Sequence, residues 1–400
     1  MITNSKTLIN YNPWDYSFFI WYVTDACFEH TMFSIIGQLI FVFYSFKTCI
    51  GQRNFKWSYL FSLYALFIFF CWFNISSGHA LNVSTAKNML NVVTRNMVFI
   101  VFFFQYIRQV NFEKFKYLFF DACIVSSIII LIINFIQTGS LQMRDVEDSF
   151  NGNLQAVNNA IAIGWLYCQR DVKLRKWEIL MCLFLLFFCI LAGTRKAIIV
   201  LFMIVILYII LSKPYKIVAN GLKLVIISGI VLFLLFKVDF IYDIIGNRFE
   251  GFLGFINGKN EIDGSTDTRS RFIELGYAYF LTEPIYGHGI DCFREIRGAY
   301  DTYSHNNYIE LLFGIGLPGT IIYYLLYIIP FLKGVYKYFN NRNKNVILGV
   351  LIIFACLFSD YGMVSYFSRD TYLKILLCYL LVSTQSNTIT NKKTSSYAKA

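Results

Sequence analysis

The chain has 400 residues, of which 57% are hydrophobic and only 15% are charged, and its formal net charge is +11. A soluble domain carries roughly a quarter charged residues, so this composition excludes an ordinary soluble protein and predicts contact with lipid. The excess of Lys and Arg does not indicate a nucleic-acid partner, because these residues recur in short clusters between apolar segments.

The apolar segments predict an all-α, polytopic membrane protein. A transmembrane helix needs about 20 apolar residues, or about 17 if it runs straight through the hydrocarbon. A doubtful segment at 14–28 is interrupted by Asp15 and Asp25. Eleven other segments qualify as spans: 32–50, 58–76, 92–108, 116–137, 154–169, 177–193, 196–212, 220–238, 306–332, 346–364 and 370–384.

Loop charge predicts the topology of these spans. Every second loop, together with the C-terminal tail, holds more than half of the 35 Lys and Arg residues, which places these loops in the cytoplasm. If 14–28 crosses the membrane there are twelve spans with both ends inside; otherwise there are eleven. In both cases the long loop 239–304 lies outside, and its eleven acidic residues outnumber its six Lys and Arg.

The predicted organisation has four parts. Residues 1–238 form the N-terminal transmembrane helices, 239–305 the large extracytoplasmic loop, 306–384 the C-terminal transmembrane helices and 385–400 a cytoplasmic tail. The polar N-terminus lacks an early apolar core with a small-residue cleavage site, so we expect insertion through the spans themselves.

The outer loop contains a candidate anion site. Asp267 is expected to cap a helix that runs from about Arg269 to Glu283 and is stopped by Pro284. Arg269 and Arg271 then fall in the first turn, where cations oppose the positive end of the helix dipole. A bound anion would resolve this conflict. The alternative is that both arginines are ordinary solvated charges.

A second basic site is expected where the span 196–212 begins. Arg195 and Lys196 lie there on the same outer side, against the topology rule. A lone boundary Arg is usually structural, because its long side chain reaches back to the interface. Two outer sites of unexplained positive charge favour one shared anion more than either site does alone.

A candidate base lies at the mouth of the span 306–332. His305 precedes Asn306 and Glu310, which would stack one above the other at i and i+4 on a helix. Histidine accepts a proton near neutral pH, so it is a candidate general base. The alternative is a histidine that only caps the helix or anchors it at the interface.

Amide side chains crowd the outer mouth of the span 154–169. They suit a hydroxyl-rich ligand such as a sugar, and they suit hydrogen bonding between helices equally well. The four His residues show no ligand spacing, so we expect no transition metal and no cofactor. The amide residues are Asn151, Asn153, Gln155, Asn158 and Asn159.

Four motifs together resemble the O-antigen ligase and O-antigen polymerase superfamily, whose multi-span enzymes handle undecaprenyl-diphosphate-linked glycans. They are GTRKA at 193–197, RSR at 269–271, PIYGHG at 284–289 and SHNNYIELLFGIGLPG at 304–319. The Asn-rich segment 151–159 is similar to an upstream element of the family. The resemblance covers roughly the second half of the chain.

This resemblance implies a metal-independent, membrane-embedded glycosyltransferase, similar to the type C fold, with its active site outside the inner membrane of a bacterium. Arg195 and either or both of Arg269 and Arg271 would bind the lipid diphosphate, and His305 would be the general base. Lys196 follows the first Arg where many relatives carry a small or apolar residue. The supporting residues would be Lys196, Asn306, Glu310, Asn153 and Asn158.

Three functions are compared on this basis. The leading hypothesis is a polysaccharide polymerase for O-antigen, capsule or exopolysaccharide repeat units, with a flippase and a chain-length regulator as further partners. A ligase that transfers the glycan to lipid A core or another acceptor is the nearest alternative. A transporter or flippase for lipid-linked sugars would need polar residues deep in several spans. Few such residues are present, and Asp121 is the clearest of them, so an enzyme is favoured over a transporter.

Overall fold

The structure is a computed structural model of the 400-residue chain. It describes residues 11–28, 31–53, 55–141, 143, 152–168, 175–212, 264–341 and 343–383, and all regular elements in these ranges are helices. The chain divides into two compact units. The first comprises Met1–Phe55 and Phe104–Leu201, and the second comprises Lys56–Phe103 and Phe202–Ala400.

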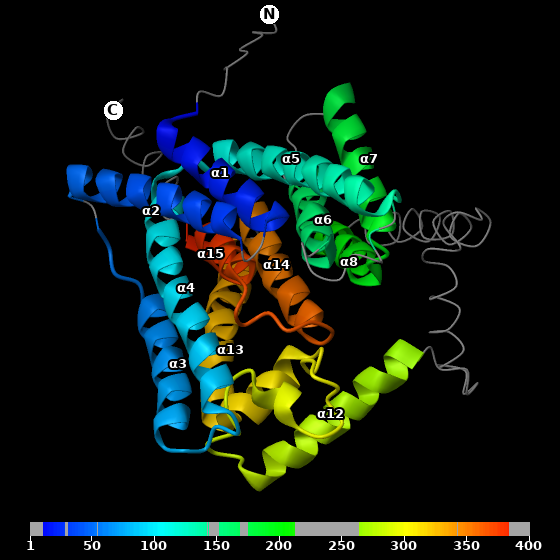
Figure 1. Ribbon diagram of the computed structural model, residues 1–400. Helices are drawn as coiled ribbons and strands as arrows, with labels where there is room; N and C mark the ends of the chain where they lie inside the picture. Colours follow the sequence, from blue (N-terminus) through cyan, green and yellow to red (C-terminus); the bar gives the residue numbers. More distant parts are fainter. Residues whose placement is uncertain are drawn as a thin grey trace, which may run out of the picture. The chain divides into compact units, whose positions relative to one another are not determined.

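The first unit is a helical bundle in which α1 packs against α2 and α5, while α6 packs against α5 and α7 (Figure 1). It also contains the C-terminal end of α4 and the first turns of α8. The bounds are α1 Pro13–Cys27, α2 Met32–Gln52, α4 Val83–Gln109, α5 Phe112–Thr138, α6 Gly152–Cys168, α7 Lys176–Leu191 and α8 Arg195–Ser212.

Aromatic packing and an ion pair of the buried Asp15 fix α1 inside this unit. The rings of Phe18 and Tyr106 stack with centroids 5.5 Å apart. The Asp15 carboxylate lies 2.5 Å from the Lys114 ammonium and accepts a hydrogen bond from the Tyr106 hydroxyl at 3.0 Å. The doubtful segment 14–28 is therefore a packed helix, and whether it crosses the membrane stays a prediction.

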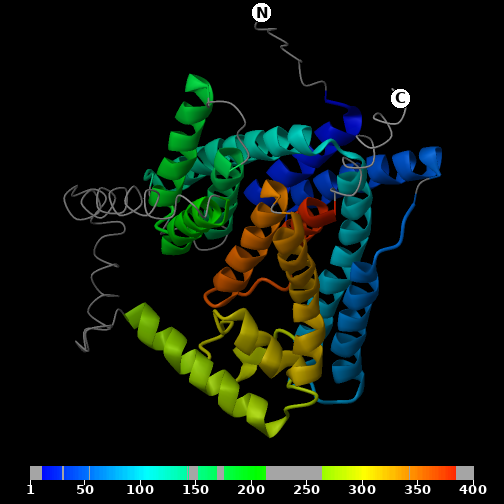
Figure 2. The ribbon, with the colours of Figure 1, turned by 180° about the vertical axis from the view of Figure 1, so that it is seen from behind.

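The second unit is built around α13, which packs against α3, α12, η3, α14 and α15 (Figure 2). It also contains most of α4, which is tied to α3 by a hydrogen bond from the Tyr64 hydroxyl to the Val93 carbonyl. The bounds are α3 Tyr59–Ser76, α12 Gly264–Thr282, η3 Cys292–Glu295, α13 Asn307–Asn341, α14 Lys344–Asp360 and α15 Arg369–Ser383.

The helix α13 is broken at Gly316, whose φ of 67° and ψ of −176° leave the helical region. The segment PIYGHG at 284–289 crosses this break and pairs with it, since the His288 amide donates to the Phe313 carbonyl at 2.7 Å and the Leu317 amide to the Pro284 carbonyl at 2.8 Å. A Cβ on Gly316 would lie 2.3 Å from the Ile285 carbonyl oxygen. The two glycine-rich motifs therefore form one backbone junction.

Five helices among the described residues are long and apolar enough to cross a membrane. Together with the purely helical structure they support a polytopic α-helical membrane protein. The count of eleven or twelve spans stays a prediction, and the predicted span 220–238 and the tail 385–400 lie outside the described residues. The five helical segments are Met32–Gly51, Tyr59–Ser76, Val83–Gln109, Lys114–Thr138 and Asn307–Asn340.

Candidate functional site

The helix that carries the arginine pair begins earlier than its sequence pattern indicates. We expected a start near Arg269 with Asp267 as the cap, but α12 begins at Gly264, so Asp267 lies inside the helix. A carboxylate is stabilising in the first helical turn as well as at the cap position, so Asp267 did not by itself mark the start of the helix. Arg269 and Arg271 lie in the second and third turns, so the helix-dipole argument for an anion there is wrong.

Both arginines are nevertheless exposed. Burial raises the pKa of the Tyr303 hydroxyl, and the positive charge of Arg269 acts on the same hydroxyl in the opposite direction. Tyr303 is two residues from His305. Arg269 and the predicted base therefore lie in one neighbourhood of the second unit.

His305 lies beside two aromatic rings at the entry to α13. Its backbone has a φ of +56°, in the left-handed region. Its ring lies parallel to the buried ring of Phe272 on α12, with 6.2 Å between centroids and 5° between planes, and 4.4 Å from the ring of Tyr303. Because Phe272 directly follows Arg271, the structure brings His305 and the arginine-bearing helix together.

The predicted supporting residues Asn306 and Glu310 hold the backbone around His305. The Asn306 side-chain oxygen caps α13, accepting from the Tyr308 and Ile309 amides at 3.0 and 3.2 Å. The buried Glu310 carboxylate accepts from the Ser304 amide at 2.9 Å. Both side chains are engaged with the backbone on either side of His305, so their role in the structure is to position it.

A buried polar network directly follows His305, and sequence reasoning missed its centre. The Asn307 amide nitrogen donates to the Tyr324 hydroxyl at 3.0 Å and to the Asp360 carboxylate at 3.1 Å, and its oxygen accepts from the Ser365 and Tyr366 amides at 2.9 and 3.1 Å. The network joins α13, α14 and the loop before α15. The second Asn of the SHNNY motif was the available signal.

Arg294 is a further cation that the sequence analysis did not single out. Its guanidinium donates to the Asp291 carboxylate at 2.8 Å. Burial raises the pKa of Asp291, and the bonded Arg294 acts against that rise. Since Asp291 balances its charge, Arg294 is a weaker anion candidate than the exposed Arg269 and Arg271.

The first unit holds the other predicted cations. Arg195 is the first residue of α8, followed by Lys196, and both side chains are half-buried. The hydroxyl of Thr194 donates a hydrogen bond to the Asn153 side-chain oxygen, so the start of α6 lies beside the start of α8. Arg195 thus belongs to one compact unit, and the α12 arginines with His305 belong to the other.

The predicted amide residues of α6 differ in their burial and in their partners. Gln155 donates to Asn159 at 2.9 Å, and Asn159 donates to the Ser127 hydroxyl of α5 at 2.8 Å. These two amides join helices, as one of the alternatives proposed. Asn158 is also buried, whereas Asn153 is exposed at the helix start. Asn151 lies outside the described residues.

His288 has a structural role. It is buried, and its Nε2 atom lies 3.0 Å from the Thr282 hydroxyl and 2.8 Å from the Tyr279 carbonyl oxygen. Within the described ranges no three His, Cys, Asp or Glu side chains form a group that fits a metal ion. The expectation that the protein works without a metal or cofactor stays a prediction.

These features define a multi-pass helical membrane protein that presents cations and a histidine at the entry to one broken helix. The family model described as O-antigen ligase matches residues 180–324, from α7 to the break in α13 and beyond it. This match confirms the resemblance to the O-antigen ligase and polymerase superfamily. Among curated proteins, no sequence similar to the chain was found.

Proposed function

We propose that the protein is a polysaccharide polymerase that transfers a glycan from undecaprenyl diphosphate to the sugar end of another lipid-linked repeat unit. The observation that carries this proposal is the placement of His305 against α12, the helix of Arg269 and Arg271. Both elements lie within the segment that matches the O-antigen ligase family.

The arginines would stabilise the leaving group. Negative charge develops on the diphosphate oxygens as the glycosyl bond breaks, and fixed guanidinium groups stabilise that charge in the transition state. Each hydrogen bond between Arg and a phosphate oxygen is worth roughly 1.5–3 kcal/mol. Arg195 and Lys196, with Asn153 and Asn158 in support, remain predicted diphosphate ligands from the sequence, and all four belong to the first unit.

His305 would be the general base. A neutral imidazole takes the proton from the acceptor hydroxyl while the acceptor oxygen bonds to the anomeric carbon and the diphosphate departs from the opposite face. This is a single displacement with inversion, and it needs no nucleotide sugar. The stacked ring of Phe272 and the cap formed by Asn306 fix the position of the imidazole.

The ligase is the second candidate, because the matching family model is described as O-antigen ligase. It would use the same cations and the same base and differ only in the acceptor.

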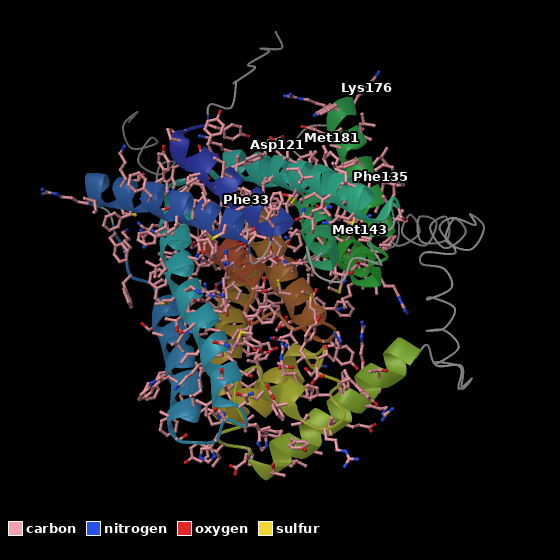
Figure 3. The ribbon with its side chains drawn as sticks, viewed as in Figure 1. Phe33, Asp121, Phe135, Met143, Lys176 and Met181 are labelled. Carbon is pink, nitrogen blue, oxygen red and sulfur yellow. The ribbon has the colours of Figure 1, made fainter. Side chains whose placement is uncertain are left out.

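A transporter is less favoured, because it would need polar residues deep in several spans. Asp121 is exposed on α5 of the first unit (Figure 3), and the buried charges Lys374 and Asp370 of the second unit pair with each other at 2.6 Å.

The decisive experiment supplies purified protein in detergent micelles with a lipid-linked repeat unit, without nucleotide sugar and with a metal chelator present. The proposal expects a ladder of longer lipid-linked products. Replacing His305 with Ala should abolish the ladder, and at least one of Arg195→Ala, Arg269→Ala and Arg271→Ala should do the same, while Tyr277→Ala on the exposed face of α12 should not. A ladder from all four site variants would refute the proposed site.

The same assay separates the alternatives. Product that appears only when a lipid A core acceptor is added would favour the ligase, and movement of intact substrate across a vesicle without new bonds would favour the transporter. A ladder from the isolated protein would also show that a flippase and a chain-length regulator are not needed for bond formation. Protease protection of the α12–α13 loop in right-side-out and inverted inner-membrane vesicles would test the proposed outward-facing location.

A further inference from the structure

A polar groove in the second unit is lined by none of the residues predicted to bind the diphosphate or to act as the base. It is an open hollow of about 550 Å³ between the turn joining α3 to α4, the C-terminal part of α12, and η3 with the residues after it. Pockets for small ligands commonly have volumes of about 300–1,000 Å³. Its polar lining includes Asn82, Ser84, Tyr279, Glu295 and Arg297.

The polar wall of this groove is held in place before any ligand arrives. The Glu295 carboxylate accepts hydrogen bonds from the Asn82 amide at 3.0 Å and from the Thr85 hydroxyl at 2.8 Å. The Asn82 side-chain oxygen in turn accepts from the Ser84 amide at 3.0 Å. A wall fixed in this way binds a polar ligand without a large cost of ordering side chains.

The aromatic wall is fixed as well. The ring of Tyr279 makes edge contacts with His288, at 5.6 Å between centroids, and with Phe313, at 6.0 Å. The α3–α4 turn is joined to the PIYGHG segment by a hydrogen bond from the Leu81 amide to the His288 carbonyl at 2.8 Å. The groove is therefore part of the same backbone junction that breaks α13.

The charges of the groove select against an anion. Glu295 and Arg297 carry opposite signs, and the Arg297 side chain is exposed and has no hydrogen bond or ion pair with the described residues. A carboxylate accepts hydrogen bonds and a guanidinium donates them, while a tyrosine ring packs against apolar C–H groups. A neutral ring compound with many hydroxyl groups can donate to the carboxylate, accept from the guanidinium and pack its C–H groups on the tyrosine ring.

We propose that this groove binds an uncharged saccharide of a few sugar units, at residues other than the predicted diphosphate-binding arginines and the predicted base His305. Its role as a subsite for the glycan being extended rests on the proposed function, whereas saccharide binding itself does not. Glu295 and Arg297 lie on the chain segment that leads to His305, so a glycan held there would be anchored to the loop of the predicted base.

The test measures binding without turnover. The purified full chain is applied to an array of neutral bacterial oligosaccharides of two to four sugars, and the best binder is titrated by calorimetry. Arg297→Ala and Glu295→Gln should each raise the Kd by about tenfold, as expected for the loss of a hydrogen bond to a charged group. The exposed Arg297 side chain has no hydrogen bond or ion pair with the described residues, so its replacement should leave folding unchanged.

Two controls isolate the groove. Lys87→Ala removes an exposed charge from the next turn of α4, and His305→Ala removes the predicted base; both should leave the Kd within about twofold of the wild-type value. Inorganic phosphate should not compete. Absence of binding to the array, a Kd unchanged in both groove variants, or competition by phosphate would each overturn the proposal. Saccharide binding without any polymer ladder would count against the proposed function alone.

Discussion

The imidazole of His305 lies parallel to the phenyl ring of Phe272, with 5° between the ring planes and 6.2 Å between the centroids. His305 belongs to the loop before α13, and Phe272 belongs to α12 directly after Arg271. This stacking contact connects the predicted base with the helix of the predicted diphosphate ligands, so the proposed site includes a buried aromatic side chain as well as charged groups.

Replacing Phe272 with Leu should therefore lower the rate of product formation. Leucine keeps an apolar side chain in the buried position but removes the flat surface against which the imidazole rests. We expect kcat to fall by roughly tenfold with little change in KM, because a misplaced base raises the barrier of the chemical step. Tyr277→Ala on the exposed face of the same helix is the control. A Phe272→Leu enzyme with wild-type kcat would contradict this role.

The network centred on Asn307 should contribute strongly to stability. Asn307→Ala leaves the buried Asp360 carboxylate without one of its donors, and each buried polar group without a partner costs about 1–3 kcal/mol. Thermal unfolding in detergent should show lower melting temperatures for Asn307→Ala and for Asp360→Ala, and no change for the exposed control Asn88→Ala. The double variant should be less destabilised than the sum of the two single effects. Additive losses would mean that the two side chains act independently.

The break in α13 should require glycine at 316. Gly316→Ala places a Cβ 2.3 Å from the Ile285 carbonyl oxygen at a positive φ, so we expect a loss of roughly 1–3 kcal/mol or more of unfolding free energy. Gly51→Ala is the matched control, because Gly51 lies in α2 with open space around its Cβ position. That replacement should be neutral or stabilising by up to about 1 kcal/mol. Equal melting temperatures for the two variants would disprove the packing argument.

The carboxyl of Asp291 should make stability depend on pH. Burial raises its pKa above the ordinary value of 3.8, so the folded protein binds this proton more tightly than the unfolded chain does. Stability should then fall as pH rises through the interval between the unfolded and folded pKa values, and rise as pH is lowered. We expect wild type to gain melting temperature relative to Asp291→Asn between pH 7 and pH 4. A constant or opposite difference would show that Arg294 fully compensates the burial.

Most of what could be predicted followed from local patterns. The start of α13 next to His305 was legible, because an apolar run reports on the backbone directly. The start of α12 was misplaced, because Asp267 fits the first turns of a helix as well as its cap. Asn307, Asp360 and Arg294 were missed, since each acts through a partner that is distant in sequence or not distinguished by any pattern.

The sequence by itself determined that the chain is helical, membrane-spanning and similar to O-antigen ligases, because apolar length and motif chemistry are properties of short segments. Only the tertiary structure decided that PIYGHG pairs with the broken α13, that Phe272 stacks on His305 and that Asn307 joins three elements. These relationships depend on contacts between residues tens of positions apart. Helix packing selects them, and no local spacing encodes them.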